Sequence, residues 1–240
     1  MRYILIHKTE PRWERGEIPS RELIAQVGKL LGELSRANAF RGGEGLRSSA
    51  LGVRVRFSGG ERVSLTRGPL QGENELPAGF SIVRTGTLEE ATEWATRLGK
   101  VFGEVEFDIR PVTEPWDIGM APRPEELKTQ RYMLLRKATS DSESVGLSEK
   151  ERAALDGWIA EAGRSGVHVA TETMRPSRRG RRYKNSQGGM TTIDGPFTES
   201  KELIAGYAIV EAASLDEACR WALRYIDCVG SDEVDVRELE

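Results

Sequence analysis

Two carboxylates and a histidine in the last third of the sequence could carry out acid–base chemistry. Asp194 stands where a predicted strand ends and a turn begins at Gly195-Pro196. His168 and Glu172 lie on an earlier predicted strand. A carboxylate that transfers protons near neutral pH needs burial or a neighbouring charge to bring its pKa upward from about 3.9. We therefore take Asp194, His168 and Glu172 as candidate catalytic residues.

Each of these residues also has a structural interpretation. Asp194 could accept backbone N–H bonds and so serve only the turn. His168 is flanked by two valines and could replace an apolar residue of the core. Glu172 needs a partner if it is buried, because an unpaired buried carboxylate is costly, and an arginine such as Arg175 could provide one. The sequence leaves these alternatives open.

A strongly basic stretch follows Glu172 and could bind an anion. Arg175, Arg181 and Tyr183 are its candidate substrate-binding residues, and four further cations accompany them at Arg178, Arg179, Arg182 and Lys184. Guanidinium groups suit carboxylates and phosphates because their paired N–H donors match the geometry of these anions. The alternative is a solvated basic loop without a ligand.

Composition limits the classes of function. The net charge of −3, from 35 basic and 38 acidic residues, makes a nucleic-acid partner unlikely, because such proteins usually show a basic excess. The chain has no apolar run near the roughly 20 residues of a membrane helix, and residues 1–7 are typical of a strand rather than a signal peptide. Two histidines and two cysteines lack metal-ligand spacing. We expect a cytoplasmic protein of bacterial type, with idle thiols and neither metal nor cofactor.

An internal repeat organises the whole sequence. Displaced by 127 positions, residues 67–95 align without a gap with residues 194–222, and displacements of 128 and 129 match the segments upstream. The matches include Gly68-Pro69 with Gly195-Pro196, Trp94 with Trp221, Glu44 with Glu172, and Arg2-Tyr3-Ile4-Leu5 with Arg131-Tyr132-Met133-Leu134. We predict a tandem duplication of residues 1–112 and 131–240, joined by a proline-rich linker at 113–130.

Both copies show the same order of predicted elements. In the first copy, apolar spacing and turn residues predict helices at 21–36 and 88–98 and strands at 3–7, 39–46, 53–57, 62–66, 79–85 and 104–110. In the second copy they predict helices at 149–162 and 215–225 and strands at 132–136, 167–174, 206–212 and 233–238. Ser20, Thr87 and Ser214 are candidate helix N-caps, and Ser148 with Glu151 resembles a capping box.

The order β-α-β-β-α-β is that of a ferredoxin-like domain with an extended hairpin. A four-stranded sheet with helices on one face leaves its other face bare, and two copies could bury these faces against each other. Fusion makes the partner intramolecular and so favours pairing. We predict an α+β fold of two ferredoxin-like domains paired within one chain, and further homodimerisation stays possible.

The second copy resembles a known family. Asp194-Gly195-Pro196-Phe197-Thr198-Glu199-Ser200-Lys201-Glu202, followed by Ala205-Gly206-Tyr207, is similar to the DGPF motif of the YCII-related family. The stretches 133–135 and 172–177 also resemble that family. The resemblance covers nearly all of residues 131–240 and, more weakly, residues 1–112. It implies the dimeric α/β-barrel superfamily, here as an intramolecular pseudo-dimeric barrel, and makes Lys201 of the motif a candidate substrate-binding residue.

The family is regarded as one of potential small-molecule enzymes, with an Asp and in some members a His at the site. In the first copy Arg67 replaces this Asp, Leu70 replaces the Phe, and Gly72 and Asn74 replace the Glu-Lys pair. If the Asp is catalytic, the first copy is degenerate and the pair keeps one site.

Two functions follow from these residues. The first is an acid–base enzyme that acts on a small anionic or carboxylate-bearing metabolite through Asp194. The alternative is a non-catalytic module that binds a small ligand or regulates another process. Its basis is the lack of a convincing nucleophile, metal set or phosphate loop in the sequence.

Overall fold

The computed structural model describes residues 1–186, 188–197 and 200–240. It is a mixed α+β protein with two antiparallel six-stranded sheets and six α-helices in these residues. The strands are β1 (Arg2–Lys8), β2 (Phe40–Gly45), β3 (Val53–Ser58), β4 (Glu61–Arg67), β5 (Pro77–Thr85), β6 (Val105–Pro111), β7 (Gln130–Lys137), β8 (His168–Thr173), β9 (Arg181–Ser186), β10 (Gly189–Asp194), β11 (Ile204–Glu211) and β12 (Glu233–Glu238). The helices are α1 (Pro11–Glu14), α2 (Arg21–Arg36), α3 (Leu88–Phe102), α4 (Ser140–Ser144), α5 (Glu149–Arg164) and α6 (Leu215–Val229), with short 3-10 turns η1 (Ser49–Leu51) and η2 (Ser177–Arg179).

The four long helices begin where the sequence predicts. The side chains of Ser20, Thr87 and Ser214 each accept a backbone N–H at the first turn of α2, α3 and α6. Ser148 and Glu151 form the expected capping box of α5. Helices α3 and α6 run four residues beyond their predicted ends, to Phe102 and Val229. Each of these two helices ends at a glycine with a positive φ, which is a conformation that glycine adopts without strain.

The composition of the sheets differs from the expectation of one sheet per repeat. Sheet 1 has the order β10-β9-β12-β1-β11-β2, and sheet 2 has the order β4-β3-β6-β7-β5-β8. Calling β1–β6 the first half and β7–β12 the second half, each sheet takes two strands from one half and four from the other. Strand β1 pairs with β11 and β12 of the second half, and β7 pairs with β5 and β6 of the first half. The two halves therefore exchange their first two strands.

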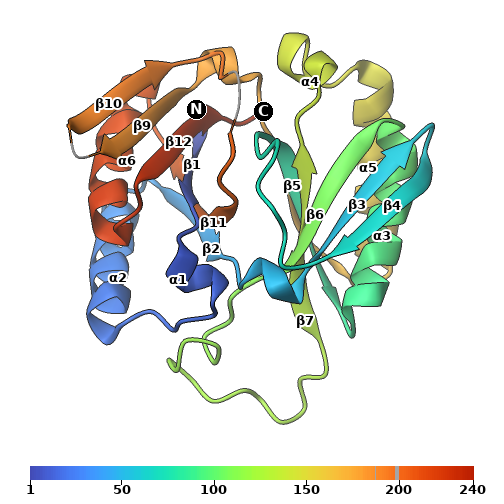
Figure 1. The fold of residues 1–240 in the computed structure, drawn as a ribbon, viewed down its shortest axis with the longest axis horizontal. Coiled ribbons are helices and arrows are strands. Elements are labelled where there is room, and N and C mark those ends of the chain that lie inside the picture. Colours follow the sequence, from blue (N-terminus) through green and yellow to red (C-terminus); the bar gives the residue numbers. More distant parts are fainter. Residues whose placement is uncertain (187, 198–199) are drawn as a thin grey trace.

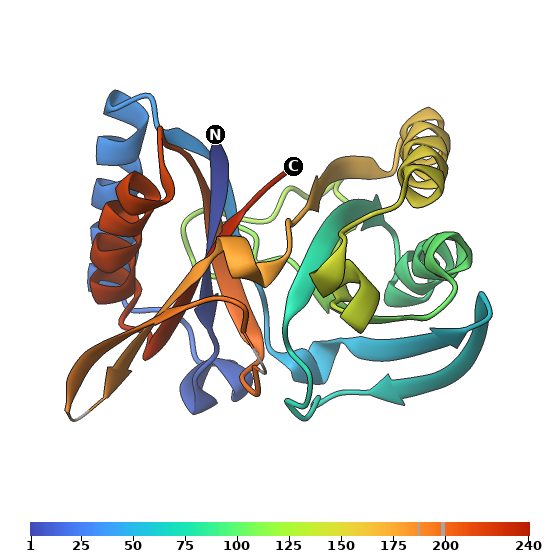
Figure 2. The ribbon, with the colours of Figure 1, turned by 90° about the horizontal axis from the view of Figure 1, so that it is seen from above.

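The layers stack as helices, sheet, sheet and helices (Figures 1 and 2). Helices α2 and α6 pack against sheet 1, and α3 and α5 pack against sheet 2. A third apolar cluster fills the space between the sheets, with side chains such as Ile4 and Ile209 from sheet 1 and Ile82 and Met133 from sheet 2. The bare faces that the sequence analysis expected are thus buried against each other. Residues 113–129, between the halves, contain neither helix nor strand.

One Gly-Pro turn lies beside each sheet and packs against a 3-10 turn. The peptide bonds Gly68-Pro69 and Gly195-Pro196 are both cis. A Cβ on Gly195 would lie 1.8 Å from the backbone oxygen of Ser177, and one on Gly68 equally close to that of Ser49. The hydroxyls of the same two serines accept the backbone N–H of Phe197 and Leu70. Only glycine fits at these two positions, which explains why the sequence keeps Gly-Pro twice.

We expect Gly195→Ala to destabilise the protein by roughly 3 kcal/mol, because the new methyl group must displace the η2 backbone. Gly157→Ala is the matched control, since a Cβ there meets nothing within 4 Å and lies within α5. Helix propensity predicts that this control is neutral or up to about 1 kcal/mol more stable. Urea unfolding of both variants checks the difference, and equal stability of the two would contradict the steric account.

Candidate functional site

Asp194 and Arg181 lie together on the β9–β10 hairpin. They are cross-strand partners, and Arg181 Nε donates to Asp194 Oδ1 over 2.7 Å. Arg181 Nη1 also donates to Asp216 Oδ1 of α6 over 2.9 Å. The side chains of Asp194 and Asp216 are 71% and 75% exposed. The hydrogen bonds that Arg181 donates to Asp194 and Asp216 raise its pKa, and the three side chains form an ion-pair network at the surface.

Tyr183 points away from solvent toward α6. Its side chain is buried in the core between sheet 1 and the helices. Burial, followed by a hydrogen bond with Cys219, raises the pKa of Tyr183 to about 12. The phenol is therefore neutral at pH 7. Arg182, between Arg181 and Tyr183, points to the opposite face of the sheet and is buried there.

His168, Glu172 and Arg175 belong to a different part of the molecule. Glu172 lies on β8, at the edge of sheet 2, and its Oε1 accepts a hydrogen bond from Arg2 Nη1 over 2.6 Å. Arg175 instead pairs with Glu238 of β12, so the expected Glu172–Arg175 partnership is replaced by two separate ion pairs, of which Arg2–Glu172 joins the two halves. His168 Nε2 lies 3.0 Å from Thr171 Oγ1, and burial lowers its pKa. The predicted residues thus form two groups, one in each sheet.

Lys201 lies in the loop that follows the second Gly-Pro turn. Its side chain is exposed, and its backbone oxygen lies where a Cβ of Gly72 would be. Two motif residues beside it, Thr198 and Glu199, lie outside the described residues. The contact with Gly72 brings the two Gly-Pro loops of the molecule together, and Glu75 N donates to Ser200 O over 2.7 Å at the same place.

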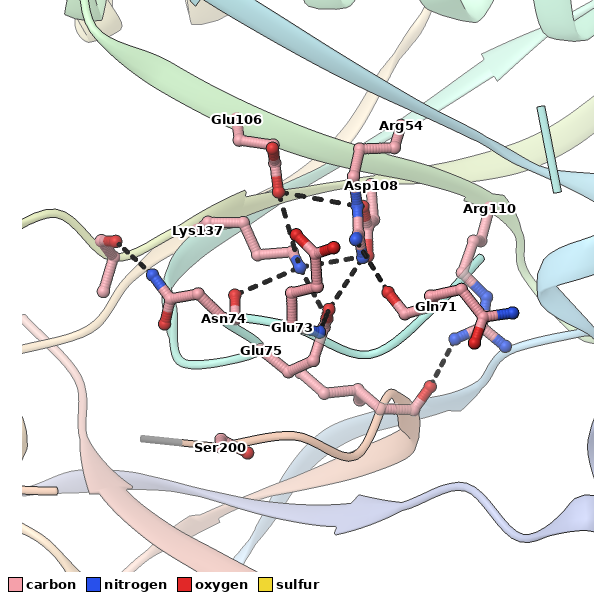
Figure 3. Close-up of polar contacts among 12 residues, drawn as sticks. Arg54, Gln71, Glu73, Asn74, Glu75, Glu106, Asp108, Arg110, Lys137 and Ser200 are labelled. Atoms are coloured by element: carbon pink, nitrogen blue, oxygen red, sulfur yellow. Dashed lines mark hydrogen bonds and ion pairs between the residues drawn. The ribbon is translucent and has the colours of Figure 1, made fainter. Parts of the chain in front are cut away.

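Sequence reasoning missed a buried cluster of charges on the inner face of sheet 2 (Figure 3). At its centre is Lys137, the last residue of β7, whose side chain is 3% exposed. Its Nζ lies 2.6 Å from Glu75 Oε2 and 3.4 Å from Asp108 Oδ2. Glu106 borders the cluster, 3.8 Å from the same Nζ, with 31% of its side chain exposed. One buried cation is therefore surrounded by three carboxylates.

Arg54 completes this cluster from the neighbouring strand β3. Its guanidinium donates to both carboxylate oxygens of Asp108, over 2.7 and 2.9 Å, and to Glu75 Oε1 over 2.7 Å. A third nitrogen donates to the backbone oxygen of Gln71 in the covering loop. Two cations and three carboxylates hold the loop at 71–75 against the sheet. We call Arg54, Glu75, Glu106, Asp108 and Lys137 the sheet-2 cluster.

Sheet 1 carries a counterpart at the corresponding place. Lys8, the last residue of β1, lies 3.0 Å from Asp235 Oδ2 and donates to Ser200 Oγ over 2.9 Å. Arg182 donates to both oxygens of Asp235. Glu233 lies beside them and also pairs with Lys184, so that only 6% of its side chain is exposed. We call Lys8, Arg182, Lys184, Glu233 and Asp235 the sheet-1 cluster; it is more closed than the sheet-2 cluster.

Glu106 and Asp108 of the sheet-2 cluster have opposite pKa shifts. Burial raises the pKa of Glu106, although Lys137 and Arg54 act in the other direction. Burial would also raise the pKa of Asp108, but the hydrogen bond from Arg54 and the charge of Lys137 outweigh it and hold the pKa below its usual value. Two carboxyl groups whose environments separate their pKa values are typical of an acid–base pair. Glu106 and Asp108 have this arrangement two residues apart on β6.

One signal for these clusters is present in the sequence. Glu106-Phe107-Asp108 and Glu233-Val234-Asp235 alternate charged and apolar residues, which places both acids on one face of a strand. The alternation is usually the mark of a solvent-exposed face. Here the charged face turns inward, because the exchanged strands β1 and β7 bring a lysine opposite each acid pair.

Comparison with protein families finds one match. Residues 130–228 match the model of the YCII-related domain. No curated protein matches the chain in sequence. The match covers β7 to most of α6, and the resemblance stated from the DGPF-like stretch agrees with it in family and approximate range.

In the described part of the chain no group of three or more His, Cys, Asp or Glu side chains is arranged to hold a metal ion. Among the described helices none is both long enough and apolar enough to span a membrane.

We expect Lys137→Met to destabilise the protein by roughly 3–5 kcal/mol, because the buried carboxyl groups of Glu75 and Asp108 would lose one of their two cationic partners. Lys100→Met, at an exposed position of α3, should change stability by less than about 0.5 kcal/mol. Denaturant unfolding measures both. A loss below about 1 kcal/mol for Lys137→Met would mean that the cluster contributes little.

Acid should weaken the sheet-1 cluster in a defined range. Burial would raise the pKa of Asp235, but Lys8 and Arg182 outweigh it and hold the pKa at about 2. Because this value lies below the unfolded value near 3.9, the contribution is fully present above about pH 4 and is lost as the pH falls through about 2. The shift corresponds to roughly 2 kcal/mol. Unfolding free energies at pH 5 and 2.5 should therefore differ less in Asp235→Asn than in the unchanged protein, and an unaltered pH dependence would contradict the assignment.

Proposed function

We propose that this chain is a fused pair of YCII-related copies that carries out acid–base chemistry on a small anionic metabolite, with its site at the sheet-2 cluster. The proposal keeps the reaction class that the sequence suggests and moves it from Asp194 to Glu106. The single observation that carries it is the Glu106–Asp108 pair, whose pKa values are displaced in opposite directions around one lysine.

The fused pair is supported by the order of the strands. Adding six to each first-half strand number, and subtracting six from each second-half number, converts the order of sheet 1 into that of sheet 2. The Gly-Pro turns, their serine contacts and the lysine-centred clusters recur at the corresponding places. This correspondence favours two copies of one fold, joined in an intramolecular pseudo-dimeric α/β barrel.

In this proposal each member of the sheet-2 cluster has its own role. Glu106 is the proton-transferring carboxyl group, because it combines a raised pKa with partial exposure to solvent. Asp108 stays ionised and holds Arg54 and Lys137 in place. Arg54 lies at the edge of the cluster and can offer its guanidinium to an anionic group of the substrate. Displacement of the loop at 71–75 would give a ligand access.

Asp194 has a different role in this proposal. Its carboxylate is exposed and paired with Arg181, so it lacks the buried surroundings that are typical of an acid–base residue. Arg181, Asp194 and Asp216 tie the β9–β10 hairpin to α6. His168 and Glu172 belong to contacts of β8, away from this hairpin. We assign structural roles to these residues, and the Asp194→Asn variant tests this for Asp194.

A non-catalytic binding module is the second candidate. It is favoured by the pairing within the sheet-2 cluster, where Arg54 and Lys137 each already contact carboxylates. A cluster of this kind can serve only to hold a loop. The two candidates differ in whether a bound ligand is converted.

The experiment begins with a thermal-shift screen against small carboxylates, lactones, phenolics and phosphorylated metabolites, followed by turnover assays on the hits. A ligand at about 100 times its dissociation constant adds roughly 2.7 kcal/mol of stability. We expect Glu106→Gln to keep ligand binding and to lower turnover at least about 100-fold, and Asp194→Asn to leave both unchanged.

Two results would reject the acid–base proposal at the sheet-2 cluster. One is normal turnover in Glu106→Gln, and the other is loss of turnover in Asp194→Asn alone. Binding without turnover for every hit would favour the second candidate.

A further inference from the structure

Arg136 is a buried cation on the side of β7 that faces the helices. Its side chain is 7% exposed in relative terms, and its Nη2 donates to the backbone oxygen of Ala78 over 2.8 Å. The guanidinium also lies 4.4 Å from the centre of the Phe102 ring. Within the described residues no carboxylate lies within ion-pair distance of it. A buried charge without a counter-charge is costly, so Arg136 lacks the negatively charged partner that would offset its burial.

The other buried arginines of the described residues all have a carboxylate partner. Arg110 pairs with Glu14 at 3.2 Å, Arg237 with Glu143 at 3.1 Å, and Arg182 with Asp235. Burial lowers the pKa of Arg136 to about 10, and the more distant charges of Glu151 and Glu240 partly offset this. The guanidinium is therefore still charged at pH 7. Arg136 is therefore charged like these arginines but lacks their carboxylate partner.

A small pocket adjoins Arg136 between sheet 2 and the helices α3 and α5. Its volume is about 10 Å³, roughly the space for one water molecule. Leu98 and Phe102 of α3 and Leu155 of α5 form its apolar wall. Glu172 also lines it, but its carboxylate is held by Arg2. An occupant must be monatomic or nearly so.

Hydroxyl groups form the polar wall of the pocket. Ser81 Oγ lies 3.0 Å from Thr171 Oγ1, which in turn lies 3.0 Å from His168 Nε2. Thr173 adds a third hydroxyl-bearing side chain to the lining. Hydroxyl groups rotate to donate to an anion, so Arg136 with Ser81 and Thr173 supplies both charge and hydrogen-bond donors.

The corresponding place in sheet 1 is closed. The register pairs Ser81 with Thr171 in sheet 2 and Ala208 with Gly43 in sheet 1, and it places His7 where Arg136 stands. Tyr225 and Leu98 are each the eleventh residue of their helices, and the Tyr225 hydroxyl lies 2.8 Å from His7 Nδ1. Burial lowers the pKa of His7 to about 4, so this pair is neutral at pH 7. Sheet 1 thus has a filled, neutral counterpart of the Arg136 pocket.

We propose that the Arg136 pocket binds a small monovalent inorganic anion such as chloride. The anion supplies the negative charge that Arg136 lacks and accepts hydrogen bonds from the Ser81 and Thr173 hydroxyls. This site is independent of the sheet-2 cluster, which lies on the opposite face of the same sheet.

The test exchanges chloride for gluconate at constant ionic strength and follows the unfolding temperature. The unchanged protein should show a saturable rise with chloride. Arg136→His removes the permanent charge, and Leu98→Tyr fills the pocket as Tyr225 does in sheet 1, so both should abolish the rise. Arg67→Ala, at an exposed arginine, is the control and should keep it. A crystal soaked in bromide should show an anomalous peak beside Arg136.

The proposal is overturned by any of three results. These are no saturable chloride effect in the unchanged protein, an undiminished effect in Leu98→Tyr, or bromide bound elsewhere with none at Arg136. If Arg136→His does not fold, Leu98→Tyr decides, because it keeps the arginine and removes only the space.

Discussion

The exchange of β1 and β7 between the halves is the constraint on which the rest of the structure depends. Each of these strands lies in the interior of a sheet and hydrogen-bonds on both sides to strands of the other half. Removal of β1 and β7 would leave β11 and β12 of one sheet, and β5 and β6 of the other, with open inner edges and unpaired backbone groups. Each exchanged strand also ends in a lysine that enters a carboxylate pair of the other half. Backbone pairing and buried charge therefore specify the same partnership, and such redundancy is one recognised use of buried ion pairs.

The two faces of each sheet have separate tasks because side chains alternate along a strand. The face toward the helices holds most of the apolar core, while the face between the sheets is apolar at its centre and charged where the Gly-Pro loops cross. The two sheets differ in the exposure and charge of a few corresponding side chains. Glu106 is more exposed than Glu233, and Arg136 stands where His7 closes sheet 1. We accordingly place both proposed sites in sheet 2.

Much of the fold could be predicted from the sequence because it depends on local patterns. Ser20 and Ser148 mark helix starts through their own hydroxyls, and apolar alternation marks strands such as β3. The exchange could not be predicted, because the local sequence of β1 allows pairing with β11 or with β5, the strand that takes the place of β11 in the other sheet. The prediction of the candidate site was affected most by this ambiguity in strand pairing. The sequence marks Arg181 as a candidate anion-binding residue but does not show its pairing with Asp194, and the burial of Lys137 depends on which half supplies β7. Arg182 belongs to a basic stretch that the sequence interprets as solvated or anion-binding, whereas its neighbour in space is Asp235.

The most direct test of the exchanged architecture is the pattern of amide–amide nuclear Overhauser contacts across β1 and β7 in the deuterated full-length protein. We expect contacts between the residues around Ile4 and Ile209, and between those around Met133 and Ile82, as the strand registers require. A shortened linker at 121–126 should leave these contacts in place, because the sheets themselves hold the halves together. Contacts of the Ile4 segment with β5, and of the Met133 segment with β11, would show that each half builds its own sheet and would contradict the account.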